Sequence, residues 1–181
     1  MKAYKGSYNG KCKGKTFEVG KTYTHDEKIE MCKSGFHFCL NAIDVLQYYP
    51  YKKDFVLFEI EVKDGNFITE GNKSVTKSFK VLRKVPKKEY EKLLQIKLDS
   101  KGKVIWYKDS NGFELNWKYD SKGKVIWYKD STGFEQNWKY DSKGNQIWYK
   151  NSNGFEENWK YDSKGNHIWY KNSNGFEQNW K

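Results

Sequence analysis

The sequence predicts an α+β domain followed by an all-β antiparallel meander of about four two-stranded repeats, each 21 residues long. Two observations carry this prediction. A segment that opens with Asp-Ser-Lys-Gly restarts at Asp99, Asp120, Asp141 and Asp162 with little change. All eight Trp residues lie after residue 98, whereas all three Cys residues lie before it. We therefore expect a basic α+β domain at 1–85, a linker with an adaptor strand at 86–98, and an aromatic β-hairpin array at 99–181.

Short apolar runs between turn-forming residues predict the strands of the N-terminal domain. These candidate strands cover residues 16–19, 35–39, 55–62 and 78–85. The segment NAIDVLQYY at 41–49 predicts a helix with Asn41 as its N-cap. A short second helix is expected from Pro86 through Leu93, and the adaptor strand follows at 95–99.

The array is predicted from its turns. Each repeat contains two four-residue signals that begin with Asp or Asn and end with Gly, at 99–102 and 109–112 in the first copy. Asp or Asn bonds to its own backbone and Gly accepts a positive φ, which is typical of a type I turn closed by a glycine bulge. The runs between turns alternate, so that Leu115 and Trp117 share one face and Asn116 and Lys118 the other. About eight strands are expected.

The distribution of charged and apolar residues indicates what kind of partner and location to expect. Residues 1–98 hold 20 Lys or Arg against 12 Asp or Glu, and 99–181 hold 14 against 11, so most of the net charge of +11 is N-terminal. This favours contact with an acidic partner. The sequence has no apolar run of spanning length and no apolar run typical of a signal peptide, which predicts the cytoplasm of a bacterial host.

The three cysteines predict free, buried thiols. Their number is odd and they form no CxxC pair. Zinc bound by Cys12, Cys32 and Cys39 with His25 or His37 is the alternative, but the spacing matches no familiar metal site. We therefore expect no metal and no cofactor.

The repeated aromatic and polar side chains of the array are candidate binding residues, or else packing and ladder residues. They are Trp106, Trp117, Trp127, Trp138, Trp148, Trp159, Trp169, Trp180, Asn116, Asn137, Asn158, Asn179, Lys118 and Lys139. The sequence stops inside the last expected strand, so we also expect a homodimer, or a partner, at the C-terminal edge.

Two resemblances follow from these motifs. The segment KYDSKGKVIWY resembles the YD repeats of secreted Rhs-type proteins and the MORN-related YwqK hairpin repeats, and more faintly choline- and glucan-binding repeats. The order YKG, GFHFC and FVLFEIEV resembles a phage and prophage domain family of unknown function, which implies a mobile-element origin.

The same N-terminal order is distantly similar to an ADP-ribosyltransferase half-site. The resemblance implies Lys5 in place of the usual Arg, Phe38 and Cys39 in place of a hydroxyl pair, and catalytic roles for His37 and Glu70.

Together these features predict a phage or mobile-element binding protein that is not an enzyme. The concrete expectation is an anti-CRISPR-like inhibitor that contacts a host protein such as a defence nuclease. Three alternatives stay open: a nucleic-acid-binding protein that uses Lys and stacked aromatics, an ADP-ribosyltransferase-like enzyme, and a glycan-binding repeat protein. No membrane partner is expected.

Overall fold

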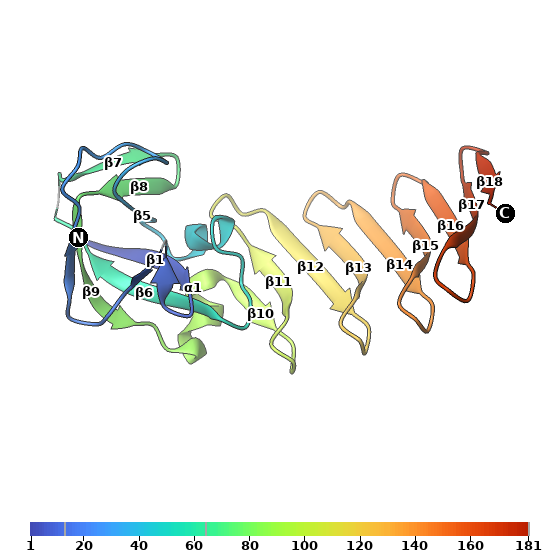
Figure 1. Ribbon diagram of the computed structural model, residues 1–181, viewed down its shortest axis with the longest axis horizontal. Coiled ribbons are helices and arrows are strands. Elements are labelled where there is room, and N and C mark those ends of the chain that lie inside the picture. The colour runs from blue at the N-terminus through green and yellow to red at the C-terminus, as the bar shows by residue number, and fades with distance from the viewer. Residues whose placement is uncertain (13, 64, 181) are drawn as a thin grey trace. The chain divides into compact units, whose positions relative to one another are not determined.

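The computed structural model describes residues 1–12, 14–63 and 65–180. The chain forms two compact units (Figure 1). The first unit contains Met1–Val104 and Asp109–Asn111, and the second contains Ile105–Lys108 and Gly112–Lys181. Among the described residues, no helix has the length and apolar character needed to cross a membrane.

The first unit is built from two antiparallel sheets. The larger sheet has the order β3-β2-β1-β6-β9-β4 and the smaller one has the order β5-β8-β7. The strands are β1 (Lys2–Tyr8), β2 (Lys11–Cys12), β3 (Lys15–Thr16), β4 (Thr22–Thr24), β5 (Phe36–Phe38), β6 (Phe55–Glu61), β7 (Phe67–Glu70), β8 (Lys73–Thr76) and β9 (Ser78–Lys84). An isolated bridge between Tyr4 and Cys39 connects β1 to the residue after β5.

Strand β6 lies at the centre of this unit and is buried on both sides. Its Phe58 and Ile60 belong to a core cluster with Phe79 and other side chains of the large sheet. On the other side, the Leu57 N–H donates to the hydroxyl of Tyr90. The alternating pattern expected of a half-solvated strand is absent from β6 because both faces are covered.

The predicted α+β class is wrong, since the described part of this unit is nearly all β. Its helices are two 3-10 turns, η1 (Ile43–Gln47) and η2 (Lys87–Glu89), and one short α-helix, α1 (Tyr90–Leu94). The predicted helix at 41–49 shrinks to η1. Three successive side chains of η1, Ile43, Asp44 and Val45, are buried, which an amphipathic α-helix with a single apolar stripe does not provide.

Two local predictions in this unit are also corrected. Asn41 is not the N-cap, because its amide donates to the Asp44 carboxylate instead. The predicted strand at 16–19 ends at Thr16. The next residue, Phe17, is buried in the core and its N–H donates to the Gly10 carbonyl.

The C-terminal part is an antiparallel hairpin meander, as predicted. Its nine-stranded sheet runs in chain order from β10 to β18. The strands are β10 (Ile96–Leu98), β11 (Val104–Lys108), β12 (Glu114–Tyr119), β13 (Val125–Asp130), β14 (Glu135–Tyr140), β15 (Gln146–Asn151), β16 (Glu156–Tyr161), β17 (His167–Asn172) and β18 (Glu177–Asn179). Figure 1 shows β11 to β18 as successive hairpins.

The second unit is a single layer of strands. None of its described side chains is buried. The strand register places Lys118 opposite Trp127 and, on the other side of the sheet, Trp117 opposite Tyr128. We call the side with Lys118, Trp127 and their equivalents the ladder face. The side with Trp117, Tyr128 and their equivalents is the aromatic face.

Candidate functional site

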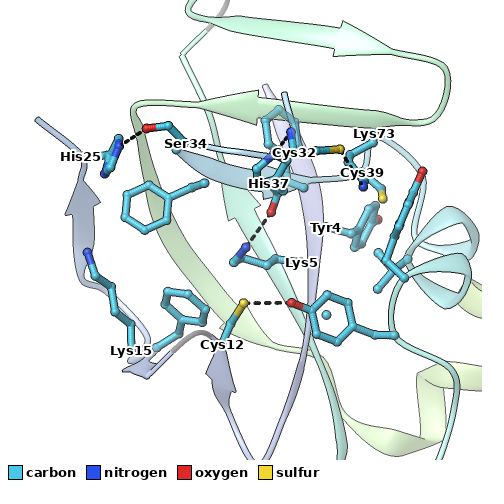
Figure 2. A pocket seen from close by; sticks show the side chains of 18 of the residues that line it. Tyr4, Lys5, Cys12, Lys15, His25, Cys32, Ser34, His37, Cys39 and Lys73 are labelled. Carbon is cyan, nitrogen blue, oxygen red and sulfur yellow. Dashed lines mark hydrogen bonds between the residues drawn. The ribbon is translucent and has the colours of Figure 1, made fainter. Parts of the chain in front are cut away.

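A pocket of about 480 Å³ opens in the first unit between β1, β5 and η1. Figure 2 shows it from close by. Its walls are largely aromatic and come from Tyr4, Phe17, Phe36, Phe38, Tyr48 and Tyr49. The charged side chains of the described residues that line it are Lys5, Lys15, Lys33, Lys73 and Glu27. The volume is in the range usual for small-molecule sites.

Lys5 lies deep in this pocket, and we call the site the Lys5 pocket. The residue is only 4% exposed, and its Nζ donates to the His37 carbonyl at 2.6 Å (Figure 2). The ammonium also lies 5.4 Å from the centre of the Phe17 ring. Aromatic faces attract a cation by their quadrupole, so the pocket stabilises a buried positive charge.

Gly6, the neighbour of Lys5 on β1, allows η1 to close one wall of the pocket. A Cβ built on Gly6 would lie 2.5 Å from Cγ1 of Val45 and 2.9 Å from the Tyr49 ring. Contacts that short are repulsive. The close approach of β1 and η1 therefore requires glycine here.

Two histidines of the pocket make defined hydrogen bonds. His37 on β5 accepts the N–H of Cys32 at its Nε2, at 2.8 Å. A neutral His37 ring consequently carries its proton on Nδ1. His25 Nε2 and the Ser34 hydroxyl are joined at 2.7 Å. These bonds position both rings at the pocket wall.

The Cys39 thiol and the Tyr49 phenol beside the pocket hold their protons at neutral pH. Burial, with the nearby Asp44 carboxylate, raises the pKa of the Cys39 thiol to about 12. Burial also raises the pKa of Tyr49, and its hydrogen bond to Cys12 adds to this. A neutral thiol is a poor nucleophile, so Cys39 and Tyr49 favour binding over covalent chemistry.

All three cysteines are free, but the prediction that they are buried holds for Cys39 alone. Cys12 is half-buried and Cys32 is exposed. The Sγ of Cys32 accepts a hydrogen bond from Lys73 at 3.5 Å. Within residues 1–12, 14–63 and 65–180, no group of three or more His, Cys, Asp or Glu side chains is arranged to hold a metal ion.

The two residues predicted for catalysis are placed differently. His37 lines the pocket. Glu70 lies at the exposed end of β7, opposite Lys73 in the register, and is not among the described lining residues. Sequence reasoning missed Lys15 and Lys73 as pocket residues. Its signals for the site were Lys5, in the first-strand motif Tyr4-Lys5-Gly6, and His37.

On the ladder face, the predicted binding residues form a repeated hydrogen-bonded row. The indole N–H of each first-strand Trp donates to a Glu on the next strand, as in Trp127 to Glu135 at 2.8 Å. Lys129 pairs with the same carboxylate at 3.7 Å, and the Trp127 hydrogen bond is the main reason that the pKa of Glu135 is lowered. The equivalent Trp residues, Trp106, Trp148 and Trp169, donate to Glu114, Glu156 and Glu177.

Lysine and asparagine complete this row. The ammonium groups of Lys118, Lys139 and Lys160 lie 4.7 to 4.9 Å from the ring centres of Trp127, Trp148 and Trp169. Asn137 donates to the Glu135 carboxylate. In the register, Asn116, Asn158 and Asn179 hold the position equivalent to Asn137. These side chains thus connect neighbouring strands of the sheet. Whether they also bind a ligand stays a prediction.

The remaining Trp residues lie on the aromatic face. Trp117, Trp138 and Trp159 tilt against Tyr128, Tyr149 and Tyr170 with ring centres 5.7 to 6.1 Å apart. Trp180 follows β18 and is 38% exposed. The two Trp residues of each repeat therefore lie on opposite faces of one sheet.

The N-terminal half of the chain matches a known protein family. A family model described as "Domain of unknown function (DUF7666)" matches residues 1–93. No curated protein matches the chain. The matched segment contains β1 to β9 and every lining residue named above.

Proposed function

The chain belongs to a family, the domain of unknown function DUF7666, whose description assigns no activity, and we propose that its first unit binds a nucleotide in the Lys5 pocket. The observation that carries this proposal is the combination of lining charges and rings. In the described part of the chain, four lysines and a single glutamate line a pocket whose walls are aromatic. A small anion with a flat ring is the ligand that such a pocket accepts best.

The two halves of a nucleotide have separate places in this proposal. Phosphate oxygens accept hydrogen bonds from the ammonium groups of Lys5, Lys15 and Lys73, and these bonds are strengthened by charge. Lys15 lies 5.1 Å from the Phe36 ring centre and Lys73 lies 4.0 Å from that of Tyr48. Phe36 is buried, whereas Tyr48 is 39% exposed and gives the base a ring on which to stack.

Binding without covalent catalysis is the reading that the pocket chemistry favours. Cys39 keeps its proton because its pKa is raised to about 12, and Glu70 is not among the described lining residues. The similarity of the N-terminal order to an ADP-ribosyltransferase half-site supports a nucleotide as the ligand class. Two differences from that half-site argue against transfer chemistry. Lys5 stands where the half-site has Arg, and Cys39 stands where it has a hydroxyl residue.

Calorimetric titration of the full chain with ADP tests the proposal. We expect binding tighter than about 1 mM, which corresponds to about −4.1 kcal/mol. Lys15→Met and Lys73→Met each remove one cation from the pocket rim and should weaken ADP binding about tenfold, the loss expected for one charge-assisted hydrogen bond. Lys80→Met, on the exposed side of β9 and outside the pocket lining, is the matched control.

Two results would overturn this function. One is no heat of binding with ADP up to millimolar concentration. The other is equal affinity in the Lys15, Lys73 and Lys80 variants. Release of nicotinamide from NAD, abolished in Glu70→Ala, would establish the transferase alternative instead.

The larger biological setting is a proposal from resemblance. A phage or mobile-element origin, and contact with a host defence nuclease, stay predictions, as do nucleic-acid and glycan binding by the array. A tagged pull-down from bacterial lysate, with and without nuclease treatment, distinguishes binding to a host protein from binding to nucleic acid. A stoichiometric protein that survives nuclease supports the inhibitor, whereas RNA or DNA alone supports nucleic-acid binding.

A further inference from the structure

The aromatic face of the second unit is almost free of charge. In the second repeat it presents Ile126, Tyr128, Gln136 and Trp138, by strand alternation and register. The third repeat places Glu157 at the position of Gln136, and Asp130 lies at the end of β13. The lysines and glutamates of the ladder lie on the opposite face. One side of this layer is therefore suited to water, and the other is a large apolar surface.

Several polar atoms of the aromatic face are already hydrogen-bonded within the sheet. The hydroxyls of Tyr140 and Tyr161 donate to the carbonyls of Val125 and Gln146, at 3.0 and 2.8 Å. The Gln136 amide donates to the Tyr149 hydroxyl at 2.6 Å. These three groups can therefore be covered by a partner without the free-energy cost of leaving a donor or acceptor unpaired.

The size of this face matches that of a stable interface. Its eight strands, β11 to β18, have three to six residues each. At about 3.4 Å per residue and about 4.8 Å between strands they give a face of about 700 Å². Stable complexes bury about 800 Å² on each partner, and exposed apolar patches this large usually mark an interaction site.

We propose that a second copy of this chain covers the aromatic face, so that two arrays pack face to face as a two-layer β-sandwich. Aligned sheets pack about 10 Å apart with interdigitated side chains, and the Trp and Tyr rings of both copies would fill that layer. Self-association satisfies the need of a single-layer sheet for a second layer. The dimer is independent of the nucleotide pocket and differs from pairing at a strand edge.

The charges of the face argue against a polyanion as the occupant. One ammonium group reaches this face from outside the strands, since Lys124 Nζ lies 4.7 Å from the centre of the Tyr140 ring. Asp130 and Glu157 are the charged residues among its described strand positions, and both are acidic. They would repel a nucleic acid or an anionic lipid surface. Within one chain, the Glu157 carboxylate accepts a hydrogen bond from Tyr170 at 2.7 Å, yet burial of this carboxylate in the dimer still weakens association.

Sedimentation of the full chain tests the dimer with two adjacent substitutions. Gln136→Lys places a charge in the middle of the aromatic face, and Asn137→Lys places the same charge on the ladder face of the same strand, β14. We expect wild type and Asn137→Lys to sediment at twice the chain mass of 21.6 kDa. Gln136→Lys should dissociate, with dimer affinity reduced about tenfold or more because the interface then buries a charge.

A third variant tests the same interface in the opposite direction. Glu157→Gln supplies the residue found at positions 136 and 178 and should strengthen dimerisation. A wild-type chain that is monomeric at all concentrations overturns the proposal. A dimer that survives Gln136→Lys, or that is lost equally in Asn137→Lys, also overturns it and points to another contact.

Discussion

Glu59 is a carboxylate enclosed in the large sheet of the first unit and held there by two cations. It is 6% exposed. Lys2 Nζ lies 2.9 Å from one carboxylate oxygen, and Arg83 Nε donates to the other at 3.1 Å. The hydrogen bond from Lys2, and then that from Arg83, lower the pKa of Glu59. The spacing of Glu59 and Glu61 indicates a shared solvent side, which is wrong for Glu59.

We predict that Glu59→Gln destabilises the first unit by about 2 kcal/mol at neutral pH, the loss expected for hydrogen bonds between charged groups. A lowered pKa contributes stability above the pKa of the unfolded chain, and that stability is lost as pH falls through the folded value. The difference between wild type and Glu59→Gln should therefore shrink towards acid pH. Urea unfolding at several pH values measures it.

Glu61→Gln is the matched control for this prediction. Glu61 is on the same strand and is exposed, so its substitution should change the free energy of unfolding little. Equal destabilisation by both variants, or a Glu59→Gln effect that does not depend on pH, would contradict the role given to the two cations.

Lys5 and Glu59 also explain why the pocket could be predicted only in part. Strand β1 pairs with β6, so that Lys5 lies opposite Phe58, and no local pattern indicates a pairing between residues so distant in sequence. A lysine in a short strand usually marks a solvated side. The resemblance to a transferase half-site indicates His37, but the basic lining of the pocket depends on these long-range pairings.

At the scale of elements, the array is predicted well because its determinants are local. Each turn is closed within a few residues, as when the Asp130 carboxylate accepts the N–H groups of Thr132 and Phe134. The helix expected at 41–49 fails because its conformation is set by burial against β1 through Gly6. Local turn chemistry survives in any context, whereas helix propensity is overridden by packing.

We predict that Gly133→Val destabilises the array by about 1–2 kcal/mol, because a β-branched residue is strained in the left-handed region. Gly133 has φ +91, and nothing lies within 4 Å of a Cβ built on it. The loss of stability thus comes from the strained backbone conformation and not from a steric clash with neighbouring atoms. Urea unfolding followed by Trp fluorescence measures it.

Gly133→Asn separates these two causes. Asn tolerates a positive φ better than Val does, and Asn9 adopts φ 52 in this chain. The Asn variant should recover much of the stability lost in Gly133→Val. If both variants unfold like wild type, the turn does not constrain the hairpin.

At the scale of the whole molecule, the two units obtain their stability from different sources. The first has a core of fully buried side chains, including Ile60, Val81 and Phe79. The second has no buried side chain among its described residues and relies on cross-strand pairs between neighbouring strands. In such arrays stability is roughly a sum of nearest-neighbour contributions. All eight Trp residues belong to the second unit, and Cys39 belongs to the first.

The Trp residues and Cys39 can therefore report separately on the unfolding of the two units, and this gives the last prediction. Ile60→Val removes one methylene from the core of the first unit and should lower its stability by about 1 kcal/mol. The urea midpoint for labelling of Cys39, followed by mass spectrometry of its peptide, should fall, while the midpoint seen by Trp fluorescence should stay unchanged. Gly133→Val should do the reverse. If each substitution moves both midpoints equally, the chain unfolds as one cooperative body. The two kinds of stability would then be coupled, and the array could not be treated as a sum of its hairpins.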